Sequence, residues 1–368
     1  MKTFCSPKKS SRGFTLVEIM VGMVIGLLGV IIIFQVFAVS EGYRRTTTSG
    51  GDAVQSGATA LFTLEREVRQ AGYGINNTDF LGCLIQGLDN LNGTVFTLEL
   101  IPVKITQGAL GAPDTITVMY GNGYLLTNPA NITQNMPNAS SDFKVDNRYG
   151  FMEGDLVVAA EAGKDCSLSQ VSNLPGNPGQ TDNVIHNPGN YTDPDTGQQV
   201  AIRYNPSASP PTSGISYTTN AKLFNLGDLP SNNIYSIENG QLMLQQLLFA
   251  AIPAAATPLY DGIVQLQAQY GRDTTGDGVV DVFDEFAPAN AADWATVLAG
   301  RLALVARSSL REKPDPATGV CNTTTVLPTW SGGPITLTDD TDGTSWKCYR
   351  YKTYETTVPL RNMIWRPS

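Results

Sequence analysis

The sequence has a single histidine, His186, among its 368 residues. This scarcity excludes a metal site built on two histidines, and it disfavours a Ser-His-Asp triad, whose base could only be this residue. Since His186 stands in a long polar segment, we expect it to be exposed. The sequence also lacks a P-loop-type glycine motif and any pattern indicating a Ser-Lys nucleophile. We therefore expect a protein that is not an enzyme.

Charged residues are also scarce, at 15% of the chain, and acidic residues outnumber basic ones by 33 to 24. A net charge of −9 argues against a nucleic-acid partner, because phosphate backbones are bound by clustered Lys and Arg. The chain is instead rich in Gly, Asn, Thr and Pro. This composition is typical of a β-rich protein outside the cytoplasm.

Polar residues are absent from Ile19 to Phe34, and Gln35 is the only interruption before Val39. A helix over residues 14–39 would be about 39 Å long, which exceeds the ~30 Å hydrocarbon core of a membrane. Glu18 lies near the start of this segment. A carboxylate at that depth costs roughly 2.5–3.5 kcal/mol unless it is paired, so it indicates a function.

The residues before this segment are basic, with Lys2, Lys8, Lys9 and Arg12 and no acid. Such a flank stays in the cytoplasm. One interpretation is a secretory signal cut near Ser40, but its apolar core should be shorter and uncharged. A second is a plain membrane anchor, which leaves Glu18 unexplained. A third is a prepilin signal.

Residues 13–18, Gly-Phe-Thr-Leu-Val-Glu, resemble the cleavage and methylation site of type IV pilins and type II secretion pseudopilins. The resemblance implies that a prepilin peptidase cuts between Gly13 and Phe14. Phe14 would then become the N-methylated first residue of the mature chain, and Glu18 its fifth. The family uses Glu18 as an assembly contact.

Helix geometry agrees with that implied role of Glu18. Phe14 and Glu18 are four residues apart and share a helix face. The carboxylate can therefore pair with the freed Phe14 amine of its own chain or of a neighbouring subunit, because unpaired buried charges are costly. Gly22, Gly26 and Gly29 form a small-residue stripe that would let helices approach closely, although membrane helices also simply tolerate glycine.

The cysteines indicate two disulfides. Cys5 lies in the leader, and four cysteines remain, which allow three pairings. We favour Cys83–Cys166 and Cys321–Cys348, because the second pair closes a short local loop. Free buried thiols are the alternative. No CxxC spacing occurs, which disfavours a zinc site of that kind.

The remaining pattern predicts an α+β protein: a leader over residues 1–13, a helix over 14–74, and a β-rich globular domain over 75–368. Residues 46–51 are rich in Thr and Gly and are expected to loosen the helix, while Gly72 and Gly74 should end it. The second half of the helix should dock on the domain through a face with three- and four-residue spacing, formed by Val54, Ala58, Leu61, Leu64, Val68 and Ala71.

Strand signals follow the helix. Alternating or continuous apolar runs predict strands near residues 96–100, 116–120, 156–160, 264–270, 301–307 and 349–358. Asn239-Gly240 predicts a hairpin between residues 234–238 and 241–244, since type I′ turns need positive φ at both central residues. The polar segment 171–218 is expected to be a long loop, either a solvated insertion or an exposed binding surface.

An aspartate-rich loop follows the strand at 264–270. Its spacing approximates an EF-hand-type calcium loop, with candidate ligands Asp273, Thr275, Asp277, the Val279 carbonyl, Asp281 and Asp284. Thr275 and Asp284 depart from the usual Asp or Asn and Glu. The alternative is an acidic turn in which Asp and Gly serve the local backbone.

Residues 65–73 and 356–362, with the leader and the aspartate loop, resemble the PilW-type minor pilins. The resemblance implies a subunit that helps prime type IV pilus assembly at or near the tip, supporting adhesion or motility. Its expected partners are other minor and major pilins, prepilin peptidase, the inner-membrane assembly platform and a tip adhesin. We expect a single-pass inner-membrane precursor with its domain in the periplasm. Alternatives are a type II secretion pseudopilin and a membrane-tethered calcium-dependent binding module.

Overall fold

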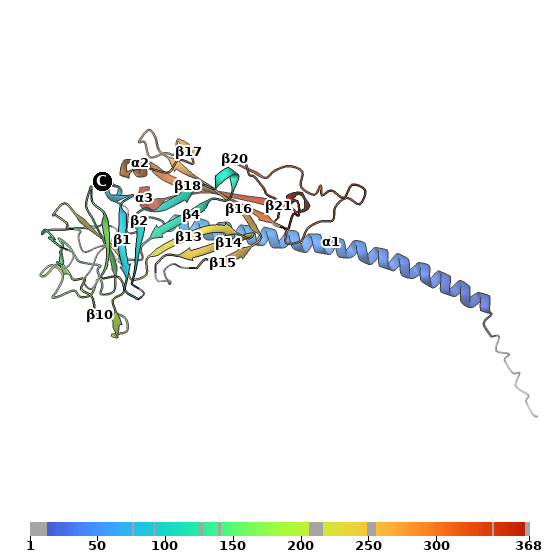
Figure 1. Ribbon diagram of the computed structural model, residues 1–368, viewed down its shortest axis with the longest axis horizontal. Coiled ribbons are helices and arrows are strands. Elements are labelled where there is room, and N and C mark those ends of the chain that lie inside the picture. Colours follow the sequence, from blue (N-terminus) through green and yellow to red (C-terminus); the bar gives the residue numbers. More distant parts are fainter. Residues whose placement is uncertain are drawn as a thin grey trace, which may run out of the picture. The chain divides into compact units, whose positions relative to one another are not determined.

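The computed structural model describes residues 13–75, 77–91, 93–124, 128–138, 141–205, 216–248, 255–340 and 342–364. It contains one long helix and a strand-rich domain, which is the α+β class expected from the sequence (Figure 1). The predicted basic leader up to Arg12 lies outside the described residues. The chain divides into two compact units, Met1–Gly51 and Asp52–Ser368.

Helix α1 spans Leu16–Gln70. It ends where Gly72 and Gly74 adopt φ of 80° and 79°, so the predicted stop signals are confirmed. Residues 46–51 are helical throughout, although we expected them to loosen the helix. Thr and Gly each cost no more than about 1 kcal/mol in a helix, which is too little to break one of this length.

The buried face of the second half of α1 differs from the prediction at its start. Val54 and Ala58 are exposed, and the buried apolar residues are Ala53, Ala60, Leu64, Val68 and Ala71. The buried face differs from the predicted one around Gly57, where a Cβ would overlap the ring of Tyr354 in the domain. Because Gly57 has no side chain, the helix approaches the sheet along the line through 53, 57 and 60.

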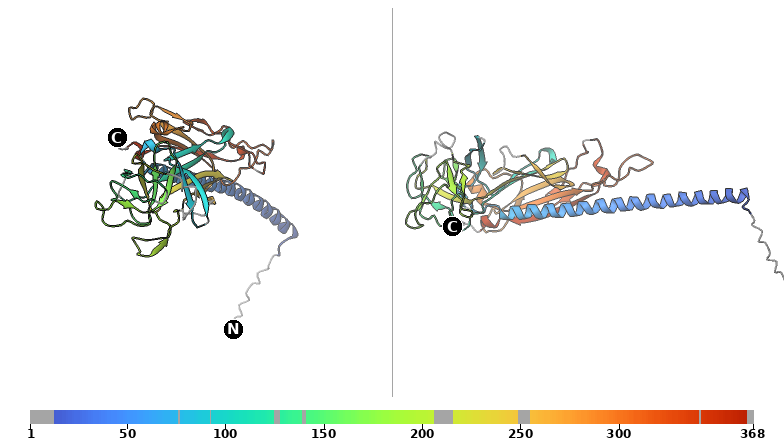
Figure 2. Two further views of the ribbon diagram at one scale, coloured as in Figure 1. Left: turned by 60° about the vertical axis from the view of Figure 1, so that its left-hand side comes forward. Right: turned by 90° about the horizontal axis from the view of Figure 1, so that it is seen from below.

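Two antiparallel sheets form one hydrophobic core with this half of α1. Figure 2 shows the helix running alongside the strands of the domain. The first has the order β15-β14-β13-β4-β3, with strands Thr257–Asp261, Gln241–Gln246, Ser231–Glu238, Thr115–Tyr120 and Val103–Thr106. The second has the order β17-β16-β18-β21, with strands Val282–Asp284, Ile263–Arg272, Val297–Arg307 and Tyr351–Pro359. The strands predicted in these sheets are confirmed.

The β13–β14 hairpin also confirms its prediction. Glu238 pairs with Gln241, and the two residues between them, Asn239 and Gly240, have φ of 51° and 74°. Positive φ at both central positions is the type I′ geometry that matches the twist of the flanking strands. The turn therefore fixes the register of this hairpin.

A third sheet has the strand order β2-β1-β8-β7-β12-β5. Its strands contribute residues to a second hydrophobic core, separate from the first. Its strands are Thr94–Glu99, Leu84–Asp89, Cys166–Gln170, Leu156–Ala160, Lys222–Gly227 and Ala130–Asn131. Strand β1 runs parallel to β8, and the other neighbouring pairs are antiparallel. Only β2 and β7 of this sheet were predicted.

Shorter elements complete the described chain. They are the strand pairs β6–β9, Phe143–Lys144 and Asn183–Val184; β10–β11, Asn190–Thr192 and Gln199–Ala201; and β19–β20, Thr329–Trp330 and Gly333–Pro334. The short helices are α2, Ala291–Ala295; α3, Arg361–Ile364; and the 3₁₀ turns η1 to η3, Thr78–Phe80, Ala109–Gly111 and Trp346–Cys348.

The described part of segment 171–218 is more structured than the long loop expected from its composition. It contains β9, β10 and β11, and it buries Val171, Tyr204 and Tyr217 in the domain. The buried rings of Tyr204 and Tyr217 supply apolar contacts in a segment that otherwise has few apolar residues. Residues 206–215 lie outside the described part of the chain.

Candidate functional site

The start of α1 is a capping box formed by two residues of the predicted processing motif. The backbone N–H and the hydroxyl of Thr15 both donate to Glu18 Oε2, each at 2.9 Å. In return, the Glu18 N–H donates to Thr15 Oγ1 at 3.2 Å. Reciprocal bonds of this kind satisfy backbone donors that a helix start leaves free. The Thr-x-x-Glu spacing is the sequence signal for such a box, and Thr15 is a residue of this site that the processing motif alone did not predict.

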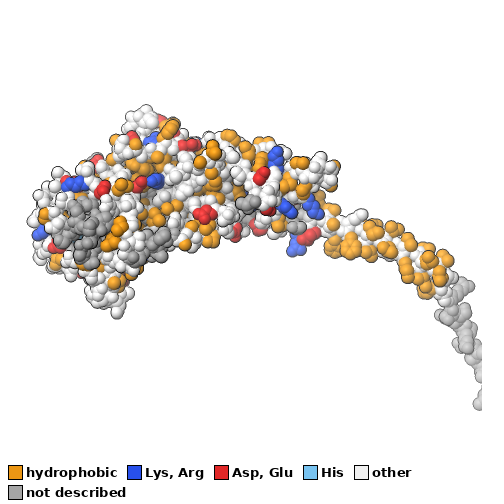
Figure 3. All heavy atoms as spheres, in the orientation of Figure 1, with side chains coloured by type: hydrophobic (Ala, Val, Ile, Leu, Met, Phe, Trp, Pro, Cys, Tyr) orange, Lys and Arg blue, Asp and Glu red, His pale blue; other side chains and the backbone are white. Residues whose placement is uncertain are grey.

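The first half of α1 exposes apolar side chains along its length, and Figure 3 shows one face of this apolar surface. Phe14 is 85% exposed, and the apolar residues from Leu16 to Val39 are exposed or nearly so. Within the described chain, α1 is the one helix long and apolar enough to cross a membrane. A Cβ at Gly22, Gly26 or Gly29 would have no neighbouring atom within 4 Å. This stripe of small residues is therefore accessible to a neighbouring helix.

The two sequence motifs at residues 65–73 and 356–362 meet at the other end of α1. The Asn362 side chain donates through Nδ2 to the carbonyls of Gln70 and Ala71, at 3.0 and 3.1 Å. The Gln70 carbonyl also accepts the Tyr73 N–H at 3.2 Å in the turn after the helix. Asn362 therefore adds a side-chain cap to the C-terminal end of α1. The sequence pattern named both motifs but gave no sign that they touch.

Strand β21 also contacts α1 nearer to the N-terminal end of the helix, at Val54 and Gly57. The Tyr354 hydroxyl donates to the Val54 carbonyl at 3.0 Å, beside the close approach at Gly57. Further along, the Tyr120 hydroxyl of β4 donates to the buried carboxylate of Glu67 at 2.9 Å. Side-chain hydrogen bonds therefore hold α1 on the domain at several points, in addition to the packing of its apolar face.

The candidate calcium ligands are each held by the local backbone. Asp273 accepts N–H bonds from Gly276 at 2.6 Å and Gly278 at 2.8 Å. Asp281 accepts the hydroxyl and the N–H of Thr274 at 2.8 and 2.7 Å. These bonds lower the pKa of both carboxyls, the Gly278 N–H most for Asp273 and the Thr274 hydroxyl most for Asp281.

The remaining candidates also lie apart from a common centre. Asp284 pairs with Arg272 at 3.0 Å, and Asp277 accepts the N–H of Val279 at 2.9 Å. Among the described residues, no group of three or more His, Cys, Asp and Glu is placed to hold a metal ion. The bonds from backbone N–H groups to Asp273 and Asp277 are of the kind that the alternative interpretation, an acidic turn, expects. Its binding of calcium stays a prediction from the sequence.

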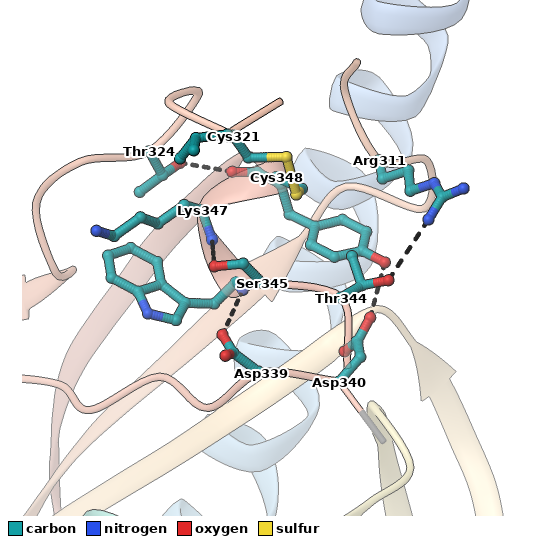
Figure 4. The surroundings of a disulfide bond; sticks show 12 residues. Arg311, Cys321, Thr324, Asp339, Asp340, Thr344, Ser345, Lys347 and Cys348 are labelled. Atoms are coloured by element: carbon teal, nitrogen blue, oxygen red, sulfur yellow. Dashed lines mark hydrogen bonds between the residues drawn. A yellow bond between two sulfur atoms is a disulfide. The ribbon is translucent and has the colours of Figure 1, made fainter. Parts of the chain in front are cut away.

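Both disulfides join the cysteines paired in the sequence analysis. Cys83 is bonded to Cys166, the first residue of β8, and Cys321 is bonded to Cys348, the last residue of η3. Around the second bond, Ser345 caps the η3 turn and the Thr324 hydroxyl donates to the Tyr349 carbonyl (Figure 4). The bond thus closes a loop that is also held by its own hydrogen bonds.

The prediction that His186 is exposed is wrong, because its relative exposure is only 8%. Its ring stacks on Phe143 with centroids 4.5 Å apart, and its Nε2 lies 3.1 Å from the Ser141 carbonyl. Burial lowers its pKa below the ordinary value. A ring held in a core in this way has a structural role.

Comparison with known proteins agrees with the geometry at both ends of the chain. The family model for the prokaryotic N-terminal methylation motif matches residues 8–34, which include the capping box and much of the apolar half of α1. The family model PilW, type IV pilus-assembly protein W, matches residues 230–362, from β13 to Asn362. No curated protein and no solved structure matches the chain. Both matches are consistent with a type IV pilus-related pilin, and the second places a PilW-type region over residues 230–362.

Proposed function

We propose that this pilin is a minor subunit that helps to initiate type IV pilus assembly and lies at or near the pilus tip. The observation that carries the proposal is the combination, in one chain, of the N-terminal methylation motif and the PilW region. In this proposal the role of the protein is structural and not catalytic. Support for adhesion or motility belongs to the same proposal, through the filament that it helps to start.

The assembly contact is the pairing of Glu18 with the amine of Phe14. Cleavage at Gly13–Phe14 creates that amine, in the chain itself and in each neighbouring subunit. In the described chain Glu18 uses Oε2 for the capping box with Thr15, which leaves Oε1 for a second partner. A paired charge in an apolar layer favours one axial register between packed helices.

The proposed course of the chain begins in the inner membrane, with the domain in the periplasm, and ends in the pilus. The apolar, exposed first half of α1 supports both locations, since it can be covered by lipid or by neighbouring helices. The proposed partners are prepilin peptidase, the assembly platform, other minor and major pilins, and a tip adhesin.

Three substitutions test whether Glu18 acts through its charge. Glu18→Gln keeps an acceptor for the capping box but loses the charge. Thr15→Ala keeps the charge and removes the two bonds of the capping box that involve the Thr15 hydroxyl, leaving only the backbone bond to Glu18 Oε2. We expect Glu18→Gln and Glu18→Ala to lower incorporation into purified pili at least tenfold, measured by immunoblot against the membrane pool. Thr15→Ala should retain most of its incorporation.

The same series can contradict the proposal. Normal incorporation of Glu18→Gln together with loss in Thr15→Ala would assign Glu18 to helix capping alone. Equal membrane levels of all variants are the control for expression.

A type II secretion pseudopilin has the same N-terminal motif and is the alternative function. Deletion of the gene separates the two: loss of pili on imaging supports the minor pilin, and loss of protein secretion with normal pili supports the pseudopilin. A membrane-tethered binding module would instead retain its leader, independently of pilin peptidase.

Calcium binding by the aspartate loop is a separate proposal, supported by the ligand spacing of residues 273–284 alone. Binding would require Asp273 and Asp281 to exchange backbone partners for the ion. Calorimetry of the full chain with millimolar calcium tests this, and the absence of both heat and a thermal shift would refute it.

A further inference from the structure

A cavity of about 170 Å³ lies where the third sheet meets the first, between β2, β3, β4 and β13. Its inner wall consists of buried residues, and its mouth consists of residues that are exposed or half-buried. The buried residues are Leu98, Ile101, Met119 and Asn232, and the others are Thr97, Glu99, Lys104, Thr117 and Leu247. Three apolar side chains and one amide therefore form the inner wall.

The amide of Asn232 gives the evidence that this cavity takes a ligand. The residue is only 3% exposed, and its Oδ1 accepts no hydrogen bond from any described residue. Few buried polar atoms of folded proteins lack a partner, because each such atom costs the free energy of its desolvation. Since Asn232 belongs to the wall of the cavity, a ligand in the cavity can supply the missing bond.

The charges around the cavity favour a neutral ligand. Glu99 and Lys104 are the only charged residues among those that line it. Lys104 Nζ donates to both carboxylate oxygens of Glu99, at 2.8 and 2.9 Å, so each charge already has its partner. A charged ligand would lose hydration on entry without gaining a counter-ion.

The size of the cavity and its free amide together select an aromatic ring that carries a hydroxyl. A cavity of about 150 Å³ is large enough for one benzene ring. A hydroxyl both donates and accepts, so it would satisfy the Asn232 amide in either of its two orientations. Among neutral side chains with a hydroxyl, serine and threonine are too small to fill this volume, and tyrosine has the ring. The sulfur of Met119 adds a favourable contact for that ring.

The strand at the mouth of the cavity favours a protein as the source of the tyrosine. Strand β2 lies at the edge of the third sheet and pairs with β1 alone among the described strands. Thr97 and Leu98 of β2 line the cavity. The open side of an edge strand can bond the backbone of an extended segment. A protein segment can therefore use both this edge and the cavity, whereas a free phenol can use only the cavity.

We propose that this cavity binds a tyrosine side chain of another protein, whose backbone lies along the open edge of β2. The tyrosine hydroxyl bonds to the side chain of Asn232, and the ring packs on Leu98, Ile101 and Met119. This site goes beyond the proposed role in pilus assembly. Its test uses the purified chain alone, so the two proposals can fail independently.

NMR of the full chain in detergent micelles tests the proposal at the cavity itself. An isotope-labelled Met119 methyl group, identified as the signal lost in Met119→Leu, reports a ring that enters. The probes are Nα-acetyl-tyrosine methylamide, the matching phenylalanine derivative, and p-cresol. We expect the tyrosine derivative to shift this signal to saturation and to bind about fivefold more tightly than the phenylalanine derivative, the effect of one hydrogen bond. Unspecific uptake into micelles would favour the phenylalanine derivative instead.

Two substitutions and a control assign the binding to this cavity. Asn232→Leu keeps the size of the side chain and removes its polar atoms, so the preference for the tyrosine derivative should vanish. Asn220→Leu makes the same change at an exposed turn outside the cavity and should keep the preference. Thr97→Trp provides a second variant in case Asn232→Leu fails to fold, because Thr97 is exposed. A bulky ring at the mouth should weaken binding of the tyrosine derivative about tenfold.

The proposal is overturned if the tyrosine derivative leaves the Met119 signal unchanged or binds no more tightly than the phenylalanine derivative. It is also overturned if folded Asn232→Leu keeps the preference, or if folded Thr97→Trp binds as the parent chain does. Tighter binding of p-cresol than of the tyrosine derivative would reject a protein as the source, because the edge of β2 would then contribute nothing.

Discussion

Asn362 links residues that are 292 positions apart, because its side chain donates to the Gln70 carbonyl at the end of α1. Asn362→Asp keeps the shape but replaces the donor with an anion beside the negative end of a helix. We expect the loss of two hydrogen bonds to lower the free energy of unfolding by about 1–3 kcal/mol. Urea unfolding, followed by fluorescence of the buried Trp294, measures it.

Asn220→Asp is the matched control, because Asn220 is exposed in a turn and its substitution introduces the same charge. It should change stability by no more than about 0.5 kcal/mol. Equal effects of the two substitutions would show that charge, and not the cap, is responsible.

His186 and Asp114 are buried groups whose pKa shifts give opposite pH dependences. The pKa of His186 is lowered by burial, so the stability from its neutral form is present above pH 6.5 and is lost as pH falls through the folded pKa. Burial raises the pKa of Asp114 from 3.8 to about 6, so its contribution is present below 3.8 and is lost as pH rises through about 6.

Comparison with His186→Gln and Asp114→Asn isolates each contribution. The parent chain should lose stability relative to His186→Gln as pH falls from 7 to 5, and relative to Asp114→Asn as pH rises from 4 to 6. Each slope is at most about 1.4 kcal/mol per pH unit for one proton. Denaturant titrations across this range check it, and parallel profiles for parent and variants would contradict these assignments.

At the scale of elements, the contact between α1 and β21 depends on Gly57. A Cβ there would overlap the Tyr354 ring and lie 2.9 Å from Ala306 Cβ. We expect Gly57→Ala to lower the free energy of unfolding by about 1–3 kcal/mol through overpacking, although alanine favours helices.

Gly51→Ala is the control on the same helix, because a Cβ at that position has nothing within 4 Å. It should raise stability by up to about 1 kcal/mol, the usual gain in a helix interior. If Gly57→Ala also stabilised the chain, the result would contradict the close contact between α1 and Tyr354 at this position.

The elements that could be predicted are those whose signal is local. Helix α1, its glycine stop and the Asn239-Gly240 hairpin depend on nearby residues, and the sequence predicted all three. Strand β8 was missed because its residues, Cys166–Gln170, are largely polar and yet all buried. Gln170 is satisfied by distant partners: it donates to the Gly154 carbonyl and accepts the Arg203 N–H. Such partners cannot be read from a sequence pattern.

The candidate functional residues can be divided in the same way, into those with a local sequence signal and those without one. Gly13, Phe14 and Glu18 form a motif within six residues, so they could be named from the sequence. Thr15 could have been named too, from its capping spacing to Glu18. The bond from Asn362 to Gln70 required the folded chain, because the two residues come from distant segments.

At the scale of the whole molecule, two disulfides restrict the unfolded chain to different extents. Cys83–Cys166 spans 83 residues and Cys321–Cys348 spans 27. Loop-closure entropy gives about 4.5 and about 3.5 kcal/mol, respectively. Replacing each pair by alanine should therefore destabilise the chain more at the first bond, as measured by denaturant unfolding. An equal or reversed order would show that local packing outweighs chain entropy.

The central claim is that the chain is processed between Gly13 and Phe14 and then enters a pilus. Mass spectrometry of the N-terminal peptide from purified pili tests it most directly. We predict that the peptide begins with N-methylated Phe14. A chain that begins at Ser40 or Glu41, or that still carries its leader, would contradict it.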